Sequence, residues 1–242
     1  MIASSEISKI RTLLLAGGLG SRLSEETINR PKPMVTIGGE PMLKHIMDIY
    51  NAQGAVEFII AIGYKGELIK EWVHQLKVPY QVACLDTGQE TLTGGRIQQF
   101  FASHSDDRIF MTYGDGLANV DLSALINLHN GGRHLATVTA VRPPARFGVL
   151  EIENDRVSRF GEKVQTDAGW INGGFFVLER EILEFFNSED EPFEKGPLVR
   201  LSQHGRLGAY KHFGFWKPMD TLREREELEI LALDNPPPWR TI

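Results

Sequence analysis

The chain has 242 residues, of which 42% are hydrophobic and 24% charged, so it is long enough to bury a substantial core. Its 26 Lys and Arg against 32 Asp and Glu give a net charge of −6, which argues against nucleic acid or an anionic membrane as partner. The single Cys84 excludes an intramolecular disulfide, and no apolar stretch approaches the roughly 20 residues of a membrane span. We expect one domain over 1–242, without an export signal, in the reducing cytoplasm.

The predicted elements alternate between strands and helices through the first half of the chain. The apolar run 10–16, which ends at Gly17-Gly18, predicts a strand buried on both faces. Helical spacing follows Pro41 and ends at Gly54, and it returns over 66–76. Further strands are predicted at 56–62, 108–112 and 135–141, with Cys84 buried in another and a helix capped by Asp121. This βαβ alternation predicts a parallel sheet covered by helices.

The second half has a different pattern. The segments 147–153 and 156–160 flank Asn154-Asp155 and predict a hairpin, and 174–178 predicts one more strand. Thr221 and Glu224 have capping-box spacing at the start of a last helix, which runs to about Leu233. The sheet is therefore expected to be mixed.

A glycine-rich turn follows the first strand, in the segment Leu15-Ala16-Gly17-Gly18-Leu19-Gly20-Ser21-Arg22-Leu23. Glycines let backbone N–H groups approach a phosphate chain, and Arg22 can form paired hydrogen bonds to phosphate oxygens. An ordinary tight turn is the alternative. A dinucleotide fingerprint is disfavoured, because Leu23 stands where its third glycine is required.

Lys32 stands between Pro31 and Pro33. Two prolines stiffen the backbone around an ammonium that could meet charge developing on phosphorus. A solvated lysine in a proline turn is the alternative.

Two aspartates stand where magnesium chemistry would need them. Asp115 follows the predicted strand 108–112, at the carboxyl edge where wound sheets bind ligands, and Asp220 precedes the last helix. Their carboxylates suit an octahedral Mg²⁺ that keeps water and phosphate as its other ligands. Asp115 could instead be a turn residue, and Asp220 a helix cap.

A second group of polar residues suits a phosphorylated sugar. The carboxylate of Glu162 and the amide of Asn172 suit hydroxyls, while Lys163 suits a monoester phosphate. A surface Glu-Lys pair and a glycine-containing strand start are the plain alternative. No histidine metal spacing and no paired nucleophile and base appear, so covalent catalysis is not indicated.

Taken together, these segments resemble the sugar 1-phosphate nucleotidyltransferases, and within them the cytidylyl-transferring branch. The resemblance runs from about residue 11 to about residue 239. Besides the glycine-rich turn and Pro31-Lys32-Pro33-Met34, it is carried by Ser24-Glu25-Glu26-Thr27, Gly63-Tyr64-Lys65-Gly66, Asp86-Thr87-Gly88, Thr93-Gly94-Gly95-Arg96, Tyr113-Gly114-Asp115-Gly116, Arg146-Phe147-Gly148, Trp170-Ile171-Asn172-Gly173-Gly174 and Phe215-Trp216-Lys217-Pro218-Met219-Asp220-Thr221.

The resemblance implies an α/β, Rossmann-like three-layer nucleotidyltransferase fold with a mixed, mostly parallel sheet. The nucleotide-binding half would span about 10–130 and the sugar-phosphate-binding half, with the C-terminal helix, about 131–242. The implied reaction is attack of glucose 1-phosphate on the α-phosphorus of CTP, with Mg²⁺ as cofactor. The implied product, CDP-glucose, would feed lipopolysaccharide sugars, and a homo-oligomer is left open.

The resemblance also implies a role for each site residue. The catalytic set would be Arg22, Lys32, Asp115, Lys163 and Asp220, with Mg²⁺ on Asp115 and Asp220. Nucleotide contacts would come from Leu15, Ala16, Gly17, Gly18, Gly20, Ser21, Arg22, Lys32, Thr93, Gly94, Gly95, Arg96 and Asp115. The sugar phosphate would meet Tyr113, Gly148, Glu162, Lys163, Asn172 and Gly173.

The sequence departs from the family at two places. The segment between Gly66 and Asp86 lacks a longer insertion, and Val164 replaces the proline that usually follows Lys163. The alternatives left open are another sugar or small phosphate acceptor, another nucleoside triphosphate, and a catalytically silent domain that senses nucleotide sugars.

Overall fold

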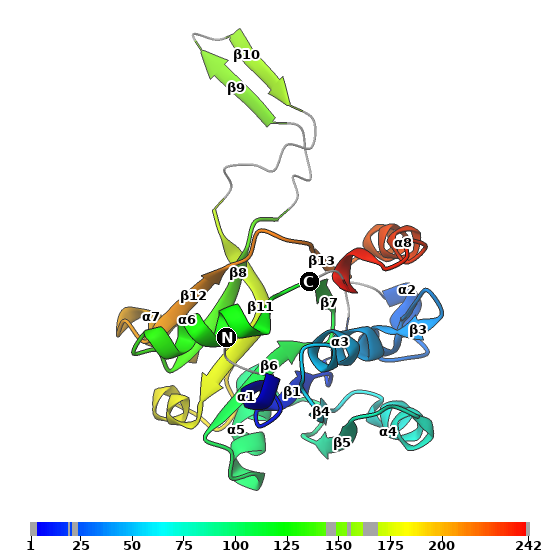
Figure 1. Ribbon diagram of the computed structural model, residues 1–242, viewed down its shortest axis with the longest axis vertical. Coiled ribbons are helices and arrows are strands. Elements are labelled where there is room, and N and C mark those ends of the chain that lie inside the picture. Colours follow the sequence, from blue (N-terminus) through cyan, green and yellow to red (C-terminus); the bar gives the residue numbers. More distant parts are fainter. Residues whose placement is uncertain are drawn as a thin grey trace.

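A seven-stranded mixed sheet forms the centre of the molecule (Figure 1). The structure is a computed structural model that describes residues 4–18, 20, 24–143, 149–153, 156–161 and 169–240. The order of the strands across the sheet is β12-β8-β11-β6-β1-β4-β5, and only β11 runs antiparallel to its neighbours. These strands are β1 (Arg11–Leu15), β4 (Glu57–Ile62), β5 (Gln81–Asp86), β6 (Arg108–Tyr113), β8 (Ala136–Val141), β11 (Ile171–Glu179) and β12 (Leu207–Lys211).

Helices and three short strand pairs surround the sheet. The helices are α1 (Ser4–Ile7), α2 (Ser24–Thr27), α3 (Met42–Asn51), α4 (Gly66–Gln75), α5 (Thr93–Ser103), α6 (Leu122–Gly131), α7 (Pro197–Gln203) and α8 (Leu222–Leu231). The short 3-10 helices are η2 (Lys32–Met34), η3 (Arg180–Phe185) and η4 (Pro238–Arg240). The paired strands are β2 (Thr36–Ile37) with β3 (Glu40–Pro41), β7 (Gly116–Ala118) with β13 (Trp216–Pro218), and β9 (Val149–Glu153) with β10 (Arg156–Gly161).

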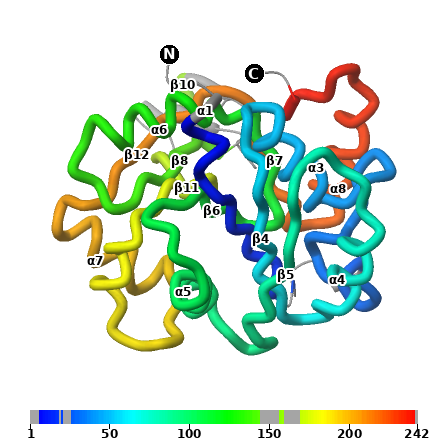
Figure 2. Tube along the Cα trace, turned by 60° about the horizontal axis from the view of Figure 1, so that its bottom comes forward, coloured from blue at the N-terminus to red at the C-terminus, as the bar shows by residue number. Residues whose placement is uncertain are grey.

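Both faces of the sheet are buried, as the apolar run of β1 predicts. Successive side chains of a strand point to opposite faces, so Leu14 joins the core under α3 and α6, whereas Leu13 joins the core under α5 and α7. Figure 2 shows these two pairs of helices on opposite sides of the strands. The predicted three-layer fold with a mixed, mostly parallel sheet is confirmed.

Four neighbouring parallel strands, β6, β1, β4 and β5, end at the same edge of the sheet. The glycine-rich turn leaves β1 there, and Gly114-Asp115 leaves β6 beside it, where Gly114 donates its N–H to the carbonyl of Leu15. This carboxyl edge is the place where open α/β sheets bind ligands.

A bulge in β11 brings further residues to the same edge. The pairing of β11 with β8 shifts register between Asn172 and Phe176. Gly174 and Phe175 within this shift have positive φ angles of 78° and 50°. A bulge bends its strand and redirects side chains, so the start of β11 turns toward the end of β6.

Three parts of the chain can be compared with the expectations from the sequence, namely Cys84, helix α5 and the hairpin of β9 and β10. Cys84 is half-buried rather than buried, because β5 is an edge strand with one neighbour. Helix α5 was not predicted as an element. The hairpin of β9 and β10 forms as expected and stands apart from the sheet in Figure 1. Its turn, Asn154-Asp155, lies outside the described residues.

Candidate active site at the carboxyl edge of the sheet

A cavity of about 960 Å³ opens at the carboxyl edge of the sheet. The end of β6, the start of β11, strand β13 and the first turns of α8 form its walls. Its lining includes Thr93, Tyr113, Asp115, Asn172, Gly173, Glu194 and Asp220.

Main-chain pairing brings the two predicted metal carboxylates together. Strand β7, which follows Asp115, pairs antiparallel with β13, which precedes Asp220, and Gly116 faces Pro218 across this ladder. Asp115 and Asp220 therefore leave the same end of a two-stranded ribbon, although they are far apart in the sequence.

The ammonium of Lys32 lies between these carboxylates. Its Nζ donates to Asp115 Oδ2 at 2.8 Å and to Asp220 Oδ1 at 2.7 Å. The Lys32 side chain is only 9% exposed, whereas that of Asp115 is 40% exposed. Burial lowers the pKa of Lys32, but the two carboxylates outweigh burial and raise this pKa above its ordinary value. The site thus holds one cation between two anions.

The backbone that carries Lys32 is fixed on several sides. Pro31 and Pro33 restrict φ on both sides of Lys32 within η2. Gly20 has a φ of 63°, and a Cβ there would lie 3.0 Å from the Lys32 Cβ. At Gly114, a Cβ would lie 2.8 Å from Pro33. These close approaches leave the long side chain as the movable part of Lys32.

The sequence left open whether Asp220 caps the last helix, and the structure shows which residue is the cap. Helix α8 is capped by Thr221, whose side chain accepts from the Glu224 N–H, while the Glu224 carboxylate accepts from the Thr221 N–H. The capping box predicted for these two residues is confirmed. The N-cap of α8 is thus Thr221, and the Asp220 carboxylate binds the Lys32 ammonium.

Tyr113 also lines the cavity, among polar groups that the sequence did not connect. Its hydroxyl donates to Glu194 Oε1 at 2.6 Å, and the Asn172 amide approaches the same hydroxyl at 3.3 Å. Burial and then the Glu194 carboxylate raise the Tyr113 pKa. The other oxygen of Glu194, Oε2, accepts from the Thr93 hydroxyl at 2.7 Å. Sequence reasoning missed Glu194, because it lies in the segment 186–196, which carries no periodic pattern.

Gly173 is constrained by close packing. A Cβ at this position would lie 2.6 Å from Val141, and the Gly173 carbonyl accepts from the indole N–H of Trp216 at 2.8 Å. This bond joins the bulge of β11 to β13.

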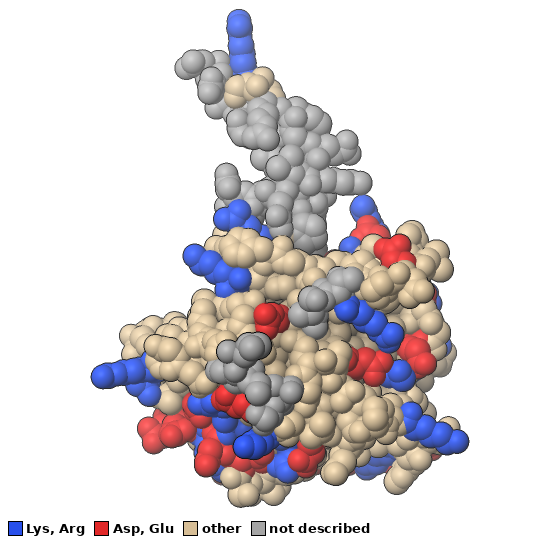
Figure 3. Space-filling model, in the orientation of Figure 1, with Lys and Arg blue, Asp and Glu red and all other residues tan. Residues whose placement is uncertain are grey.

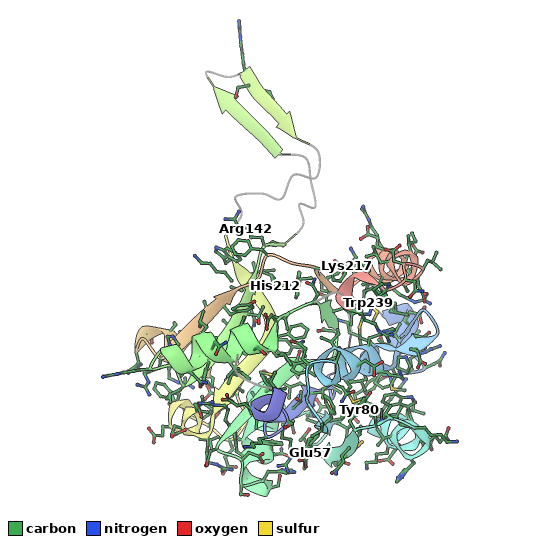
Figure 4. The ribbon with its side chains drawn as sticks, viewed as in Figure 1. Glu57, Tyr80, Arg142, His212, Lys217 and Trp239 are labelled. Carbon is green, nitrogen blue, oxygen red and sulfur yellow. The ribbon has the colours of Figure 1, made fainter. Side chains whose placement is uncertain are left out.

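The cations in the described lining of the cavity are already paired. Lys217 and Arg223 both bind the carboxylate of Glu227 on α8. Figure 4 shows Lys217 where β13 approaches that helix. Each of these cations is therefore held by a carboxylate of α8 rather than directed freely into the cavity.

The glycine-rich turn begins in a tightly packed setting. Leu15, Ala16 and Gly17 are buried, and Gly18 is exposed. The Gly17 carbonyl accepts from the buried guanidinium of Arg96, which also donates to the Ile62 carbonyl. Arg96 thus ties the ends of β1 and β4 together.

Gly94 and Gly95 lie in the first turn of α5, against the segment 186–196. A Cβ at Gly94 would meet the Glu191 carbonyl at 2.3 Å, and one at Gly95 would meet Asp190 at 2.4 Å. Both glycines are therefore required for packing. Their nucleotide contact, like that of Thr93 and Arg96, stays a prediction.

Five predicted site residues lie outside the described residues, namely Ser21, Arg22, Gly148, Glu162 and Lys163. Of the others, the structure gathers Lys32, Asp115 and Asp220 into one cluster, and it places Tyr113, Asn172 and Gly173 in the lining of the same cavity.

Three further observations concern metal ligands, membrane-spanning helices and surface charge. Across the part of the chain that the structure describes, no three His, Cys, Asp or Glu side chains converge in a way that could hold a metal ion. No helix among the described residues is long and apolar enough to cross a bilayer. Figure 3 shows acidic and basic side chains interspersed on the face in view.

Comparison with known proteins identifies a family for this arrangement. The family model described as "Nucleotidyl transferase" matches residues 11–205. Glucose-1-phosphate cytidylyltransferase of Salmonella typhi is 44% identical over 96% of this chain and 99% of its own. A probable glucose-1-phosphate cytidylyltransferase of Bacillus subtilis is 38% identical over 96% of this chain and 99% of its own.

The fold also has solved counterparts. The crystal structure of HddC from Yersinia pseudotuberculosis superposes with a TM-score of 0.70 over 91% of this chain and 98% of that protein. At 23% sequence identity, this likeness supports the fold alone.

Proposed function

Because the chain belongs to the nucleotidyl transferase family, we propose that it transfers the cytidylyl group of CTP to glucose 1-phosphate, giving CDP-glucose and pyrophosphate. The observation that carries the proposal is the cluster of Lys32, Asp115 and Asp220 beside a cavity of about 960 Å³. The choice of CTP and glucose 1-phosphate is supported by the near full-length similarity to the two cytidylyltransferases.

The carboxylate pair fits a divalent cation. Asp115 and Asp220 already share one cation through single oxygens at 2.8 and 2.7 Å, and hard carboxylate oxygens are the ligands that Mg²⁺ prefers. These two residues would hold Mg²⁺, which when bound neutralises charge on the phosphates of the nucleotide. Its other ligands would include phosphate oxygens and water.

The protein's own groups position the reactants and stabilise charge. Lys32, on its fixed backbone, would contact the α-phosphate, and the backbone at Gly17, Gly18 and Gly20, with Ser21 and Arg22, would hold the triphosphate. Lys163 would bind the phosphate of the sugar, with Glu162, Asn172 and Tyr113 on its hydroxyls. The hydrogen-bonded group of Tyr113, Asn172 and Glu194 supports the assignment of this part of the cavity to the sugar.

The reaction is then a displacement at phosphorus. An oxygen of the sugar phosphate attacks the α-phosphorus in line, a new P–O bond forms, and the bond to pyrophosphate breaks. The acceptor is a phosphate oxyanion, so no base is needed to activate it. We place this reaction in the cytoplasm and its product in the supply of sugars for a bacterial surface polysaccharide.

The test is pyrophosphate release by the purified chain with Mg²⁺. CTP, UTP, dTTP, ATP and GTP are each combined with glucose 1-phosphate and with other sugar 1-phosphates. A dominant signal for CTP with glucose 1-phosphate supports the proposal. Activity with another pair moves the specificity within the family, and silence in every pair contradicts the proposal and favours the sensing role.

A further inference from the structure

The ammonium of Lys32 stands where a cation shared by Asp115 and Asp220 must stand. Its Nζ lies 2.8 Å from Asp115 Oδ2 and 2.7 Å from Asp220 Oδ1. A Mg²⁺ ion requires carboxylate oxygens at about 2.0–2.1 Å. An ion that binds both oxygens therefore occupies the space of the ammonium, and the two cations exclude each other at these atoms.

The ammonium also changes the charge that an arriving ion meets. Two carboxylates carry two negative charges, and Lys32 cancels one of them at hydrogen-bond distance. A divalent cation that approaches this group is attracted by the carboxylates and repelled by the ammonium. The pair of carboxylates is thus a weaker metal site with Lys32 in place than without it.

Lys32 can leave the carboxylates without a change of the backbone. Its main chain is fixed by Pro31, Pro33 and Gly20, but a lysine stem has four rotatable carbon segments. Asp115, one of its two partners, is 40% exposed and lines the cavity, so the ammonium is bound to a carboxylate that an anion in the cavity would approach.

We infer that Lys32 is a built-in counter-ion that restrains metal binding by Asp115 and Asp220 until the phosphates of a nucleotide draw its ammonium away. This inference rests on the proposed function, because it takes the same three residues as the metal and phosphate site. It adds an order of events, in which the nucleotide frees the carboxylates and the protein then binds the divalent ion through them. By reciprocity, the same displacement couples the two affinities.

The test measures Mn²⁺ binding to the full chain by calorimetry, without nucleotide or sugar phosphate. Lys32→Met removes the ammonium and keeps much of the apolar stem. We expect this variant to bind Mn²⁺ about tenfold more tightly than the wild type, a coupling of ordinary size between linked sites. Lys32→Arg keeps the positive charge and is expected to bind Mn²⁺ as weakly as the wild type. Equal affinity in the wild type and Lys32→Met would overturn the inference.

A second lysine provides a matched control. Lys70 also bridges two carboxylates, with Nζ 2.7 Å from Glu67 and 3.3 Å from Asp86, but it does so on the surface. Lys70→Met is expected to leave the Mn²⁺ affinity unchanged. A gain in Lys70→Met as large as that in Lys32→Met would show a nonspecific charge effect and would overturn the inference.

Thermal unfolding gives an independent reading. Lys32→Met and Lys32→Gln remove the ammonium that both carboxylates bind, so both variants should unfold at a lower temperature than the wild type in chelator. Added Mn²⁺ should raise the unfolding temperature of each variant more than that of the wild type. The same rise in all three proteins contradicts the inference.

Failure of the inference and failure of the proposed function give different results. If Asp115→Asn abolishes Mg²⁺-dependent pyrophosphate release but Lys32→Met shows wild-type Mn²⁺ affinity, only the inference falls. If neither the wild type nor Lys32→Met binds Mn²⁺, and every pair of substrates is silent, both fall.

Discussion

Met219 donates its backbone N–H to the carbonyl oxygen of Asp115 at 2.8 Å. This bond continues the β7–β13 ladder past Pro218, and Asp220 follows directly. The separation of the two carboxylates is therefore set by main-chain bonds. A substitution that changes only a carboxylate leaves that frame in place.

Asp115→Asn and Asp220→Asn are each expected to reduce the rate of pyrophosphate release by about a hundredfold or more, because each loses an anionic ligand at the reacting phosphates. The measurement is release from CTP and glucose 1-phosphate at saturating Mg²⁺, with circular dichroism as the check on folding. Asp121→Asn is the matched control: Asp121 caps α6 by accepting from the Ala124 N–H, and asparagine caps equally well. Near-normal turnover in either site variant would contradict the metal assignment.

Glu194→Gln is expected to raise the KM for the sugar phosphate with a smaller effect on kcat. The neutral amide keeps the shape of the side chain but weakens the bond from the Tyr113 hydroxyl, which lies 2.6 Å from Oε1. Steady-state kinetics with each substrate varied in turn provide the measurement. Glu189→Gln changes an exposed carboxylate of the same segment and should leave both constants unchanged. A raised KM for CTP alone would indicate that Glu194 acts on nucleotide binding rather than on binding of the sugar phosphate.

His45→Gln is expected to make stability less sensitive to acid. Burial lowers the pKa of His45 below its ordinary value of 6.5, while its ring Nε2 bonds the Ile37 carbonyl at 2.8 Å. Below pH 6.5 the unfolded chain takes up a proton that folded His45 refuses, so this histidine costs stability as the pH falls toward its folded pKa. Above pH 6.5 it is neutral in both states.

Urea unfolding at pH 7.5 and at pH 5.5 measures this effect. The wild type should lose more stability between these two conditions than His45→Gln does. His74→Gln, at an exposed position of α4, controls for the removal of a histidine. The same loss in the wild type and in His45→Gln would show that the buried ring does not contribute.

Trp239→Ala is expected to lower the free energy of unfolding by about 3–5 kcal/mol, the usual cost of removing a large buried aromatic side chain. Trp239 is 0% exposed, lies edge-on to His45 and contacts Phe215. Phe213→Ala, at a position 78% exposed, should change it by less than about 0.5 kcal/mol. Both values come from urea titration. Similar losses in the two variants would contradict a core role for the C-terminal segment.

The sheet and its functional edge could be predicted because their signals are local. Apolar runs identify β1 and β6, and the residues that follow them reach the same edge by the geometry of parallel strands. Helix α5 escaped prediction because Gly94 and Gly95 are weak helix formers in its first turn. They are glycines because the segment 186–196 packs against them, which only the folded chain reveals.

In the candidate site, too, local patterns reveal the chemical groups but not the contacts between them. Sequence patterns select Lys32, Asp115 and Asp220 as chemical groups, and each stands near a strand end or a turn. They do not reveal that the ammonium binds both carboxylates, since that contact depends on the pairing of β7 with β13. Glu194 has no pattern of its own, and its place beside Tyr113 follows from tertiary packing alone.

Strand β6 lies between β1 and β11, so under the proposed function one strand would border both the nucleotide and the sugar phosphate. Its last residue is Tyr113, which we propose meets the sugar phosphate, and Asp115, which we propose binds Mg²⁺, follows in the next turn. A change in the twist or register of β6 would alter both substrate sites at once, and selection on one site would constrain the other. New acceptor specificity is therefore expected to evolve in the bulge of β11 and in the segment 186–196, which under the proposed function border the sugar phosphate and can change while the phosphate chemistry is kept.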